Sequence, residues 1–147
     1  MNRAELENDI RSSGFFRNKA KNIIAAAREL EKQFGAKVPQ TMDELLKLPG
    51  VARKTANIVL YNSFGVVEGI AVDTHVRRLA QRLGLSENKN PDKIEKDLMD
   101  ILSRPEWGPF SYLLIELGRN VCQAKKPRCS ECVLNKKCPK VFPSGKF

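Results

Sequence analysis

The chain has 147 residues, of which 26 are Lys or Arg and 17 are Asp or Glu, so its formal net charge is +9. An apolar fraction of 41% excludes a disordered chain of low hydrophobicity, and no apolar run approaches the roughly 18 residues that a membrane span needs. The polar N-terminus shows no signal peptide, so we expect an intracellular protein of the cytoplasm or nucleoid. The charge indicates an acidic partner, nucleic acid before a membrane surface. A basic protein without such a partner is the alternative.

Apolar residues recur at spacings of three and four along most of the chain, which predicts an all-α fold with short loops. We expect helices over residues 17–34, 42–48, 53–64, 74–83, 91–103 and 110–119. Residues 66–72 have β character, but no second segment offers a partner strand. We expect a helical domain over residues 1–104 and a C-terminal helix with a cysteine segment over residues 105–147.

Capping residues mark where these helices begin and end. Thr41 with Glu44 three residues later predicts a capping box, and Asp73 and Asn90 can each accept bonds from the first amides of a helix. Pro105 and the pair Gly108-Pro109 are expected to interrupt the chain before the last helix.

A tight turn joins the short helix that begins at Met42 to the helix that begins at Arg53. Gly50 supplies conformational freedom in this turn. The amides from Val51 to Lys54 precede or begin the second helix and lack acceptors within it. Such amides, at the positive end of a helix dipole, form an anion site that suits a DNA phosphate. The alternative is an ordinary pair of helices without a ligand.

Residues 48–57 read L-P-G-V-A-R-K-T-A-N and resemble the helix-hairpin-helix of the endonuclease III branch of DNA glycosylases. The resemblance implies a helix-hairpin-helix glycosylase fold. It also implies that Gly50, Val51, Ala52, Arg53 and Thr55 contact DNA. Members of the family often have a second glycine where this chain has Ala52, whose methyl group limits how closely a phosphate approaches.

Lys54 lies in the first turn of a predicted helix, where the dipole and Arg53 disfavour its protonated amine and favour a nucleophile. The segment around Asp73, A-V-D-T-H-V, resembles the catalytic-aspartate motif of the same family. The resemblance implies that Lys54 attacks the sugar C1′ and forms a Schiff base. It implies that Asp73 supports the positive charge on the sugar and assists proton transfer. A helix cap without catalysis is the alternative for Asp73.

Chemistry on a base inside a duplex requires the nucleotide to be flipped out and the gap to be held open. The segment from Ser13 to Ala20 resembles a family loop that enters the duplex, and Phe15 is the candidate wedge. Packing of Phe15 and Phe16 against the next helix is the alternative. For His75 the resemblance permits a contact with the DNA backbone, and a first-turn helical residue is the alternative.

All four cysteines fall in one short segment, with six, two and five residues between Cys122, Cys129, Cys132 and Cys138. Four thiolates on one loop can bind Zn²⁺ or an iron–sulfur cluster, and spacing alone does not separate these. The pattern looks like the [4Fe-4S] loop of endonuclease III, so the resemblance implies that cluster, with zinc as the alternative. Basic residues between the cysteines suit phosphate contacts.

The resemblance begins near Ile10, whereas family members have several more helices before that region. A naturally compact enzyme, a fragment and one partner of an assembly are the three explanations. Absent helices would expose apolar surface, so we expect a homodimer, a partner chain that replaces those helices, or a repacked, narrower fold.

The resemblance implies a DNA base-excision repair enzyme that removes oxidised pyrimidines and cleaves AP sites in double-stranded DNA by β-elimination. Cleavage of an already baseless site needs less of the base pocket than base removal does. Two alternatives are a non-catalytic or AP-lyase-only DNA-binding module and a related mismatch-specific glycosylase.

Overall fold

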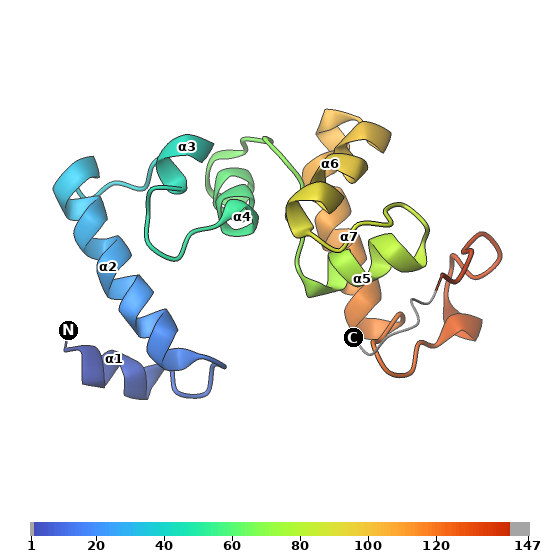
Figure 1. Cartoon of the computed structure of the whole chain (residues 1–147), viewed down its shortest axis with the longest axis horizontal. Coiled ribbons are helices and arrows are strands. Elements are labelled where there is room, and N and C mark those ends of the chain that lie inside the picture. Colours follow the sequence, from blue (N-terminus) through green and yellow to red (C-terminus); the bar gives the residue numbers. More distant parts are fainter. Residues whose placement is uncertain (1, 142–147) are drawn as a thin grey trace. The chain divides into compact units, whose positions relative to one another are not determined.

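The computed structural model describes residues 2–141. Within this range all regular structure is helical and no strand is present, which confirms the predicted fold class (Figure 1). The chain divides into two compact units, Met1–Ala56 and Asn57–Phe147. This division reflects how compactly the chain is packed. The functional division expected at residue 104 stays a prediction.

Unit 1 consists of α1 (Arg3–Asp9), α2 (Phe16–Phe34), α3 (Met42–Leu45) and the first turn of α4 (Arg53–Phe64). Helix α1 is not predicted from the sequence. It begins after Asn2, whose side-chain oxygen accepts from the Ala4 amide, and the Asn2 amide in turn donates to the Glu5 carboxylate. This helix packs against α2, which ends at Gly35 in the left-handed conformation. At α3, Thr41 accepts from the amide of Glu44, as expected of a helix cap.

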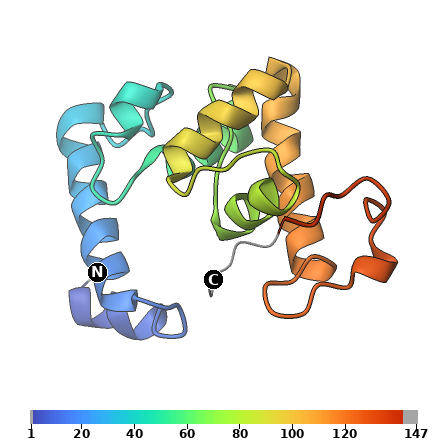
Figure 2. The ribbon, with the colours of Figure 1, turned by 45° about the vertical axis from the view of Figure 1, so that its right-hand side comes forward.

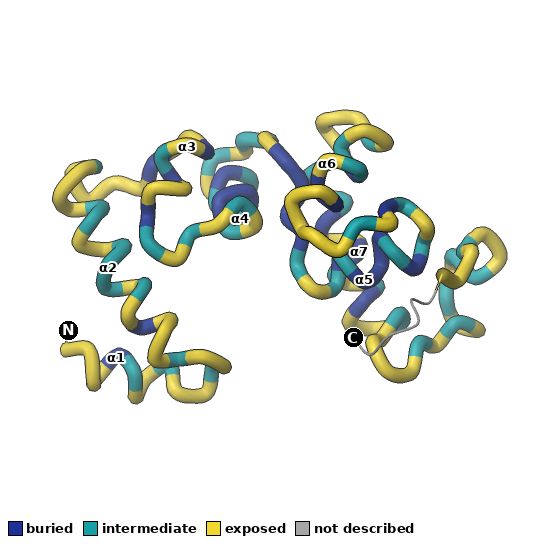
Figure 3. Tube along the Cα trace, viewed as in Figure 1, coloured by how far each residue is buried: buried dark blue, intermediate teal, exposed yellow. Residues whose placement is uncertain are grey.

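The apolar stripe predicted along α2 is only partly covered. Ala20 is fully buried, whereas Ile23 is 49% exposed and Ala27 is also exposed. Figure 3 shows that α2 alternates between covered and exposed positions along its length. Part of the apolar face of α2 is therefore open to solvent.

Unit 2 consists of the rest of α4 with α5 (Thr74–Arg82), α6 (Pro91–Ile101), η1 (Arg104–Glu106), α7 (Trp107–Asn120) and η2 (Cys129–Glu131). Helix α5 packs against both α6 and α7, and Figure 2 shows α6 above α5 and α7 running down beside it. One buried cluster forms the core of this unit, contributed by Ile70, Val72, Val76, Leu79, Ala80, Ile94, Leu98 and Leu114. Truncation of a fully buried leucine in such a core costs about 2–5 kcal/mol.

The predicted interruption before the last helix is wrong at Gly108-Pro109. Helix α7 begins at Trp107, so Pro109 lies in its first turn, where the missing N–H has no intrahelical acceptor to lose. The interruption occurs earlier, where Ser103 and Glu106 bond reciprocally around the 3₁₀ turn that contains Pro105.

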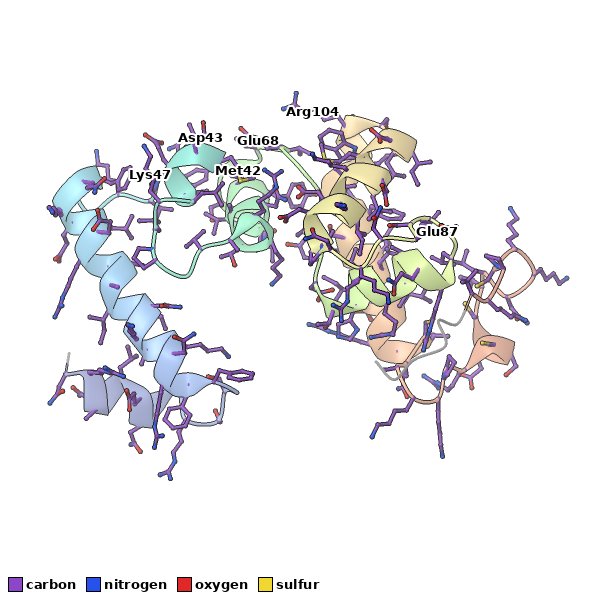
Figure 4. The ribbon with its side chains drawn as sticks, in the orientation of Figure 1. Met42, Asp43, Lys47, Glu68, Glu87 and Arg104 are labelled. Carbon is purple, nitrogen blue, oxygen red and sulfur yellow. The ribbon has the colours of Figure 1, made fainter. Side chains whose placement is uncertain are left out.

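Residues 66–72 connect α4 to α5 without forming a strand. Gly69, Ile70, Ala71 and Val72 are buried, so this connection runs through the unit instead of over its surface. Arg104, labelled in Figure 4, donates from Nε to the Val67 carbonyl at 2.9 Å. The apolar pattern that resembled a strand therefore reflects burial of an irregular segment.

In the part of the chain that the structure describes, every helix is too short or too polar to traverse a bilayer.

Asp97 on α6 gives this unit a pH-dependent element of stability. Hydrogen bonds from Ser86 and from Asn88, the latter at 2.7 Å, lower the pKa of Asp97 below its ordinary value of 3.8. Because the folded pKa is depressed, this stabilisation is present above the ordinary value and is lost as pH falls through the folded one. Asp97→Asn is therefore expected to lower the unfolding free energy at pH 7 and to have a shrinking effect below about pH 4. Urea unfolding at both pH values measures this, and an equal effect of exposed Asp100→Asn would contradict it.

Candidate functional site

The turn between α3 and α4 is shaped by Gly50, whose φ is +80°. A Cβ atom at this position would also lie 2.7 Å from the Cβ and Nδ2 atoms of Asn22 on α2. Both the left-handed backbone and the close approach of α2 therefore require glycine. The conformational role expected for Gly50 is confirmed.

The first turn of α4 carries the amides expected to bind an anion. The Ala52 carbonyl accepts from the Ala56 amide, so Ala52 precedes the helix and the amides of Lys54 and Thr55 have no acceptor within it. The expectation that the Val51 amide is available to an anion is wrong, because this amide donates to the Leu48 carbonyl at 3.1 Å. The anion site therefore begins after Val51.

The side chain of Lys54 is exposed at this helix terminus, while Arg53 and Thr55 on either side are half-buried. An exposed amine next to the positive end of a helix is accessible to a substrate. Lys54 lies in unit 1 and Asp73 lies in unit 2.

Asp73 caps α5 with one of its two carboxylate oxygens. Its Oδ1 accepts from the amides of His75 and Val76, both at 2.8 Å, and the side chain is half-buried. Such a cap stabilises a helix by about 1 kcal/mol. These two hydrogen bonds hold the carboxylate in one orientation while Oδ2 keeps its capacity to accept, so capping and chemistry are compatible at this residue.

Phe15 and His75 differ in how far they are exposed to solvent. Phe15 precedes α2 with φ +58° and is 89% exposed, which excludes the alternative in which it packs against the next helix. Phe16 instead lies under the guanidinium of Arg17, 5.4 Å from its ring centroid. The His75 ring is half-buried, with Nδ1 3.2 Å from Nη2 of Arg78.

Arg78 joins α5 to the end of α7. It is 6% exposed, and its Nη2 donates to the carbonyls of Gly118 at 2.9 Å and Cys122 at 3.0 Å. The Gly118 carbonyl lies in the last turn of α7, where intrahelical donors are absent and the dipole is negative, and Cys122 follows that helix. Burial, followed by the nearby charge of Arg82, lowers the pKa of Arg78.

Arg82 holds both ends of the cysteine segment. It is 3% exposed, and it donates to the carbonyls of Gln123 and Ala124, each at 2.8 Å. Its Nη1 lies 3.3 Å from Sγ of Cys122, and its own carbonyl lies 3.7 Å from Sγ of Cys138. The first and last cysteines therefore meet at one residue of α5.

The four cysteines line one cavity, whose empty volume is about 450 Å³. All four are free and half-buried, and the rest of the lining is mostly apolar, with Leu79, Leu83 and Leu117 on one side. A largely apolar pocket lined by four cysteines beside a guanidinium suits thiolate ligation of a metal group. Within residues 2–141, no three His, Cys, Asp or Glu side chains converge as the ligands of a single metal ion.

Sequence reasoning missed the roles of Arg78 and Arg82. Both are buried and bonded to main-chain carbonyls, so neither contributes to an exposed basic surface of α5. Their spacing of four residues, beside the apolar positions Leu79 and Leu83, is the signal that two charges share the inner face of α5. The basic residues between the cysteines are all exposed; these are Lys125, Lys126, Arg128, Lys136 and Lys137.

Comparisons with known proteins agree with this arrangement. Residues 1–104 match the HhH-GPD family, described as a superfamily of base excision DNA repair proteins. An endonuclease III of Synechocystis sp. is 56% identical over 137 residues, which are 93% of this chain and 63% of that protein.

Two solved structures, both 44% identical, match 95% of this chain. One is a non-covalent endonuclease III–DNA complex, with a TM-score of 0.88 and 65% of its chain covered. The other is a trapped endonuclease III–DNA covalent intermediate, with a TM-score of 0.89 and 66% of its chain covered. The chain thus spans somewhat less than two thirds of the relatives it matches.

Gly50 provides a direct test of the turn. Gly50→Ala is expected to destabilise the chain by about 1–3 kcal/mol, because it adds backbone strain and a clash with Asn22. DNA affinity should fall with it, since the amides of the α4 terminus lose their alignment. Chemical unfolding and fluorescence anisotropy measure the two effects. Gly14→Ala is the matched control for the unfolding measurement, because no atom lies within 4 Å of a Cβ there; equal destabilisation by both variants would contradict the assignment.

Proposed function

The chain belongs to the HhH-GPD superfamily of base excision DNA repair proteins, and from this we propose that it is an endonuclease III-like glycosylase and AP lyase. Its substrates would be oxidised pyrimidines and AP sites in double-stranded DNA. The observation that carries the proposal is the match, over 95% of the chain, to a trapped endonuclease III–DNA covalent intermediate. Lys54, an exposed amine at a helix N-terminus, is the residue through which this chain would form such an intermediate.

Lys54 would act as the nucleophile at C1′ of the damaged nucleoside. At an AP site its neutral amine adds to the sugar aldehyde, and loss of water leaves a protonated imine. The imine acidifies the proton on C2′. Removal of that proton then expels the 3′ phosphate, which breaks the strand by β-elimination. With an intact damaged nucleoside, the same attack would displace the base.

Asp73 would stabilise the positive charge that develops on the sugar and assist proton transfer. Its capping bonds to His75 and Val76 support this role, because they hold one oxygen and orient the other. Cleavage of an AP site needs fewer base contacts than base removal, so the lyase step rests on fewer residues than the glycosylase step.

DNA would be held through its phosphates at the start of α4 and on the cysteine segment. Gly50, Ala52, Arg53 and Thr55 would form the first of these contacts. The exposed lysines between the cysteines would extend the contact along the backbone. Phe15, exposed in a left-handed conformation, would be the wedge that fills the gap left by the flipped base.

The four cysteines would hold a [4Fe-4S] cluster, with Zn²⁺ as the alternative. The shared cavity, its apolar lining and the contact between Arg82 and Cys122 support thiolate ligation at this place. When bound, the cluster would fix the fold of the basic segment. We further propose that the chain acts in the cytoplasm or nucleoid, where its substrate would lie.

Borohydride trapping on duplex DNA with one AP site tests the catalytic proposal. The chain is expected to form a covalent adduct, and Lys54→Ala is expected to lose it by at least about 100-fold while still binding DNA. Lys89→Ala, an exposed lysine on a loop, is the control and should trap normally. No adduct from a folded chain that binds DNA would leave the non-catalytic DNA-binding module as the function. Product analysis on damaged and mismatched bases then separates oxidised pyrimidines from mismatches.

Metal analysis of the purified chain tests the cysteine site. We expect about four iron atoms per chain and a broad visible absorption band, both lost in Cys132→Ala. One zinc per chain without colour would establish the alternative. Removal of the metal by a chelator or an oxidant should destabilise the C-terminal segment, measured by proteolysis between residues 122 and 138. Resistance of the metal-free chain to proteolysis there would contradict the proposed structural role.

A further inference from the structure

A small cavity in unit 2 lies outside the residues assigned so far. It is lined from α4 by Asn57 and Tyr61, from the connection to α5 by Gly69 and Ala71, and from α7 by Ser111. Its empty volume is about 210 Å³, of which about 10 Å³ can hold the centre of a water molecule. That is about the space one bound water molecule requires.

Two deeply buried polar atoms at this cavity have no hydrogen-bond partner among the described residues. Asn57 is 4% exposed and Ser111 is 3% exposed. The Asn57 amide donates from Nδ2 to Oε1 of Glu95 at 2.8 Å, but its Oδ1 accepts nothing, and the Ser111 hydroxyl is also unpaired. Buried polar atoms of this kind almost always have a protein or water partner.

The side chains of Asn57 and Glu95 also lie close to the backbone that leads to Asp73. A Cβ atom at Gly69 would lie 2.0 Å from Oε1 of Glu95 and 2.9 Å from Nδ2 of Asn57. Glycine is therefore required for this approach. Gly69 stands four residues before Asp73, and the intervening Ile70, Ala71 and Val72 are buried.

We propose that one ordered water molecule occupies this cavity and bridges Oδ1 of Asn57 and Oγ of Ser111. The water donates to Asn57 and exchanges a second hydrogen bond with the serine hydroxyl. It completes a buried network that runs from Glu95 on α6 through Asn57 on α4 to Ser111 on α7. A fully satisfied buried network of this kind specifies one arrangement of the elements it joins.

The network would act as a positioning device for Asp73. Glu95 and Asn57 pack directly on Gly69, and Ala71 lines the same cavity, so the network contacts the connection that leads to α5 and its capping aspartate. This consequence rests on the proposed function, because it assigns Asp73 to the chemistry. The water site itself does not depend on that assignment.

An experimental crystal structure of the full chain at high resolution tests the water site. Density for one water within hydrogen-bond distance of both Asn57 and Ser111 is expected. An empty cavity, with the Ser111 hydroxyl turned to the Trp107 carbonyl one helical turn earlier, would overturn the proposal.

Ser111→Ala tests the energetic contribution of the network. The unfolding equilibrium constant should rise by roughly tenfold, since one partner of a buried network is removed. Ser63→Ala, at an exposed serine of α4, is the matched control and should change it by less than about twofold. Equal effects of the two variants would overturn the network.

Trapping kinetics test the positioning role. At saturating AP-site DNA, Ser111→Ala should slow adduct formation by roughly threefold to tenfold while the dissociation constant for DNA stays unchanged. An unchanged trapping rate would overturn the positioning role. If the parent chain forms no adduct, the proposed function fails, and the crystallographic and unfolding measurements still decide the water site.

Discussion

Two buried guanidinium groups on one face of α5 hold the C-terminal part of this protein together. A buried charge is costly unless it is hydrogen-bonded, and both Arg78 and Arg82 donate to main-chain carbonyls. Those carbonyls lie at the end of α7 and in the cysteine segment, where a helix terminus leaves acceptors without donors. The same bonds therefore give the buried arginines acceptors, close the end of α7 and place Cys122 against α5.

Helix α5 consequently has a polar function at each end. Asp73 caps its start and Arg82 grips the cysteine segment near its end, with the apolar core of the unit between them. Apolar packing alone would tolerate small shifts of one helix along another, whereas directional bonds to named carbonyls do not. The proposed catalytic carboxylate and the proposed metal group thus share one rigid element.

Helix α4 has a comparable division of roles. Its first turn presents Lys54 and the free amides of the hairpin, while its next turn buries Asn57 against Glu95. Within unit 1, Gly50 allows the hairpin turn through its left-handed backbone, and within unit 2 the missing side chain of Gly69 allows the close approach of Glu95.

The sequence by itself determined the all-α class, the extent of α4 from Arg53 to Phe64, the caps at Thr41, Asp73 and Asn90, and the family resemblance, because these depend on local periodicity, local hydrogen bonds and contiguous motifs. Only the tertiary structure decided that residues 66–72 are a buried connection, that Pro109 lies inside α7 and that Arg78 and Arg82 point inward. Each of these depends on a partner distant in the chain, such as the carbonyl of Cys122, which lies 44 residues from Arg78. A charged side chain looks solvent-exposed in a sequence until the acceptors that bury it are in place.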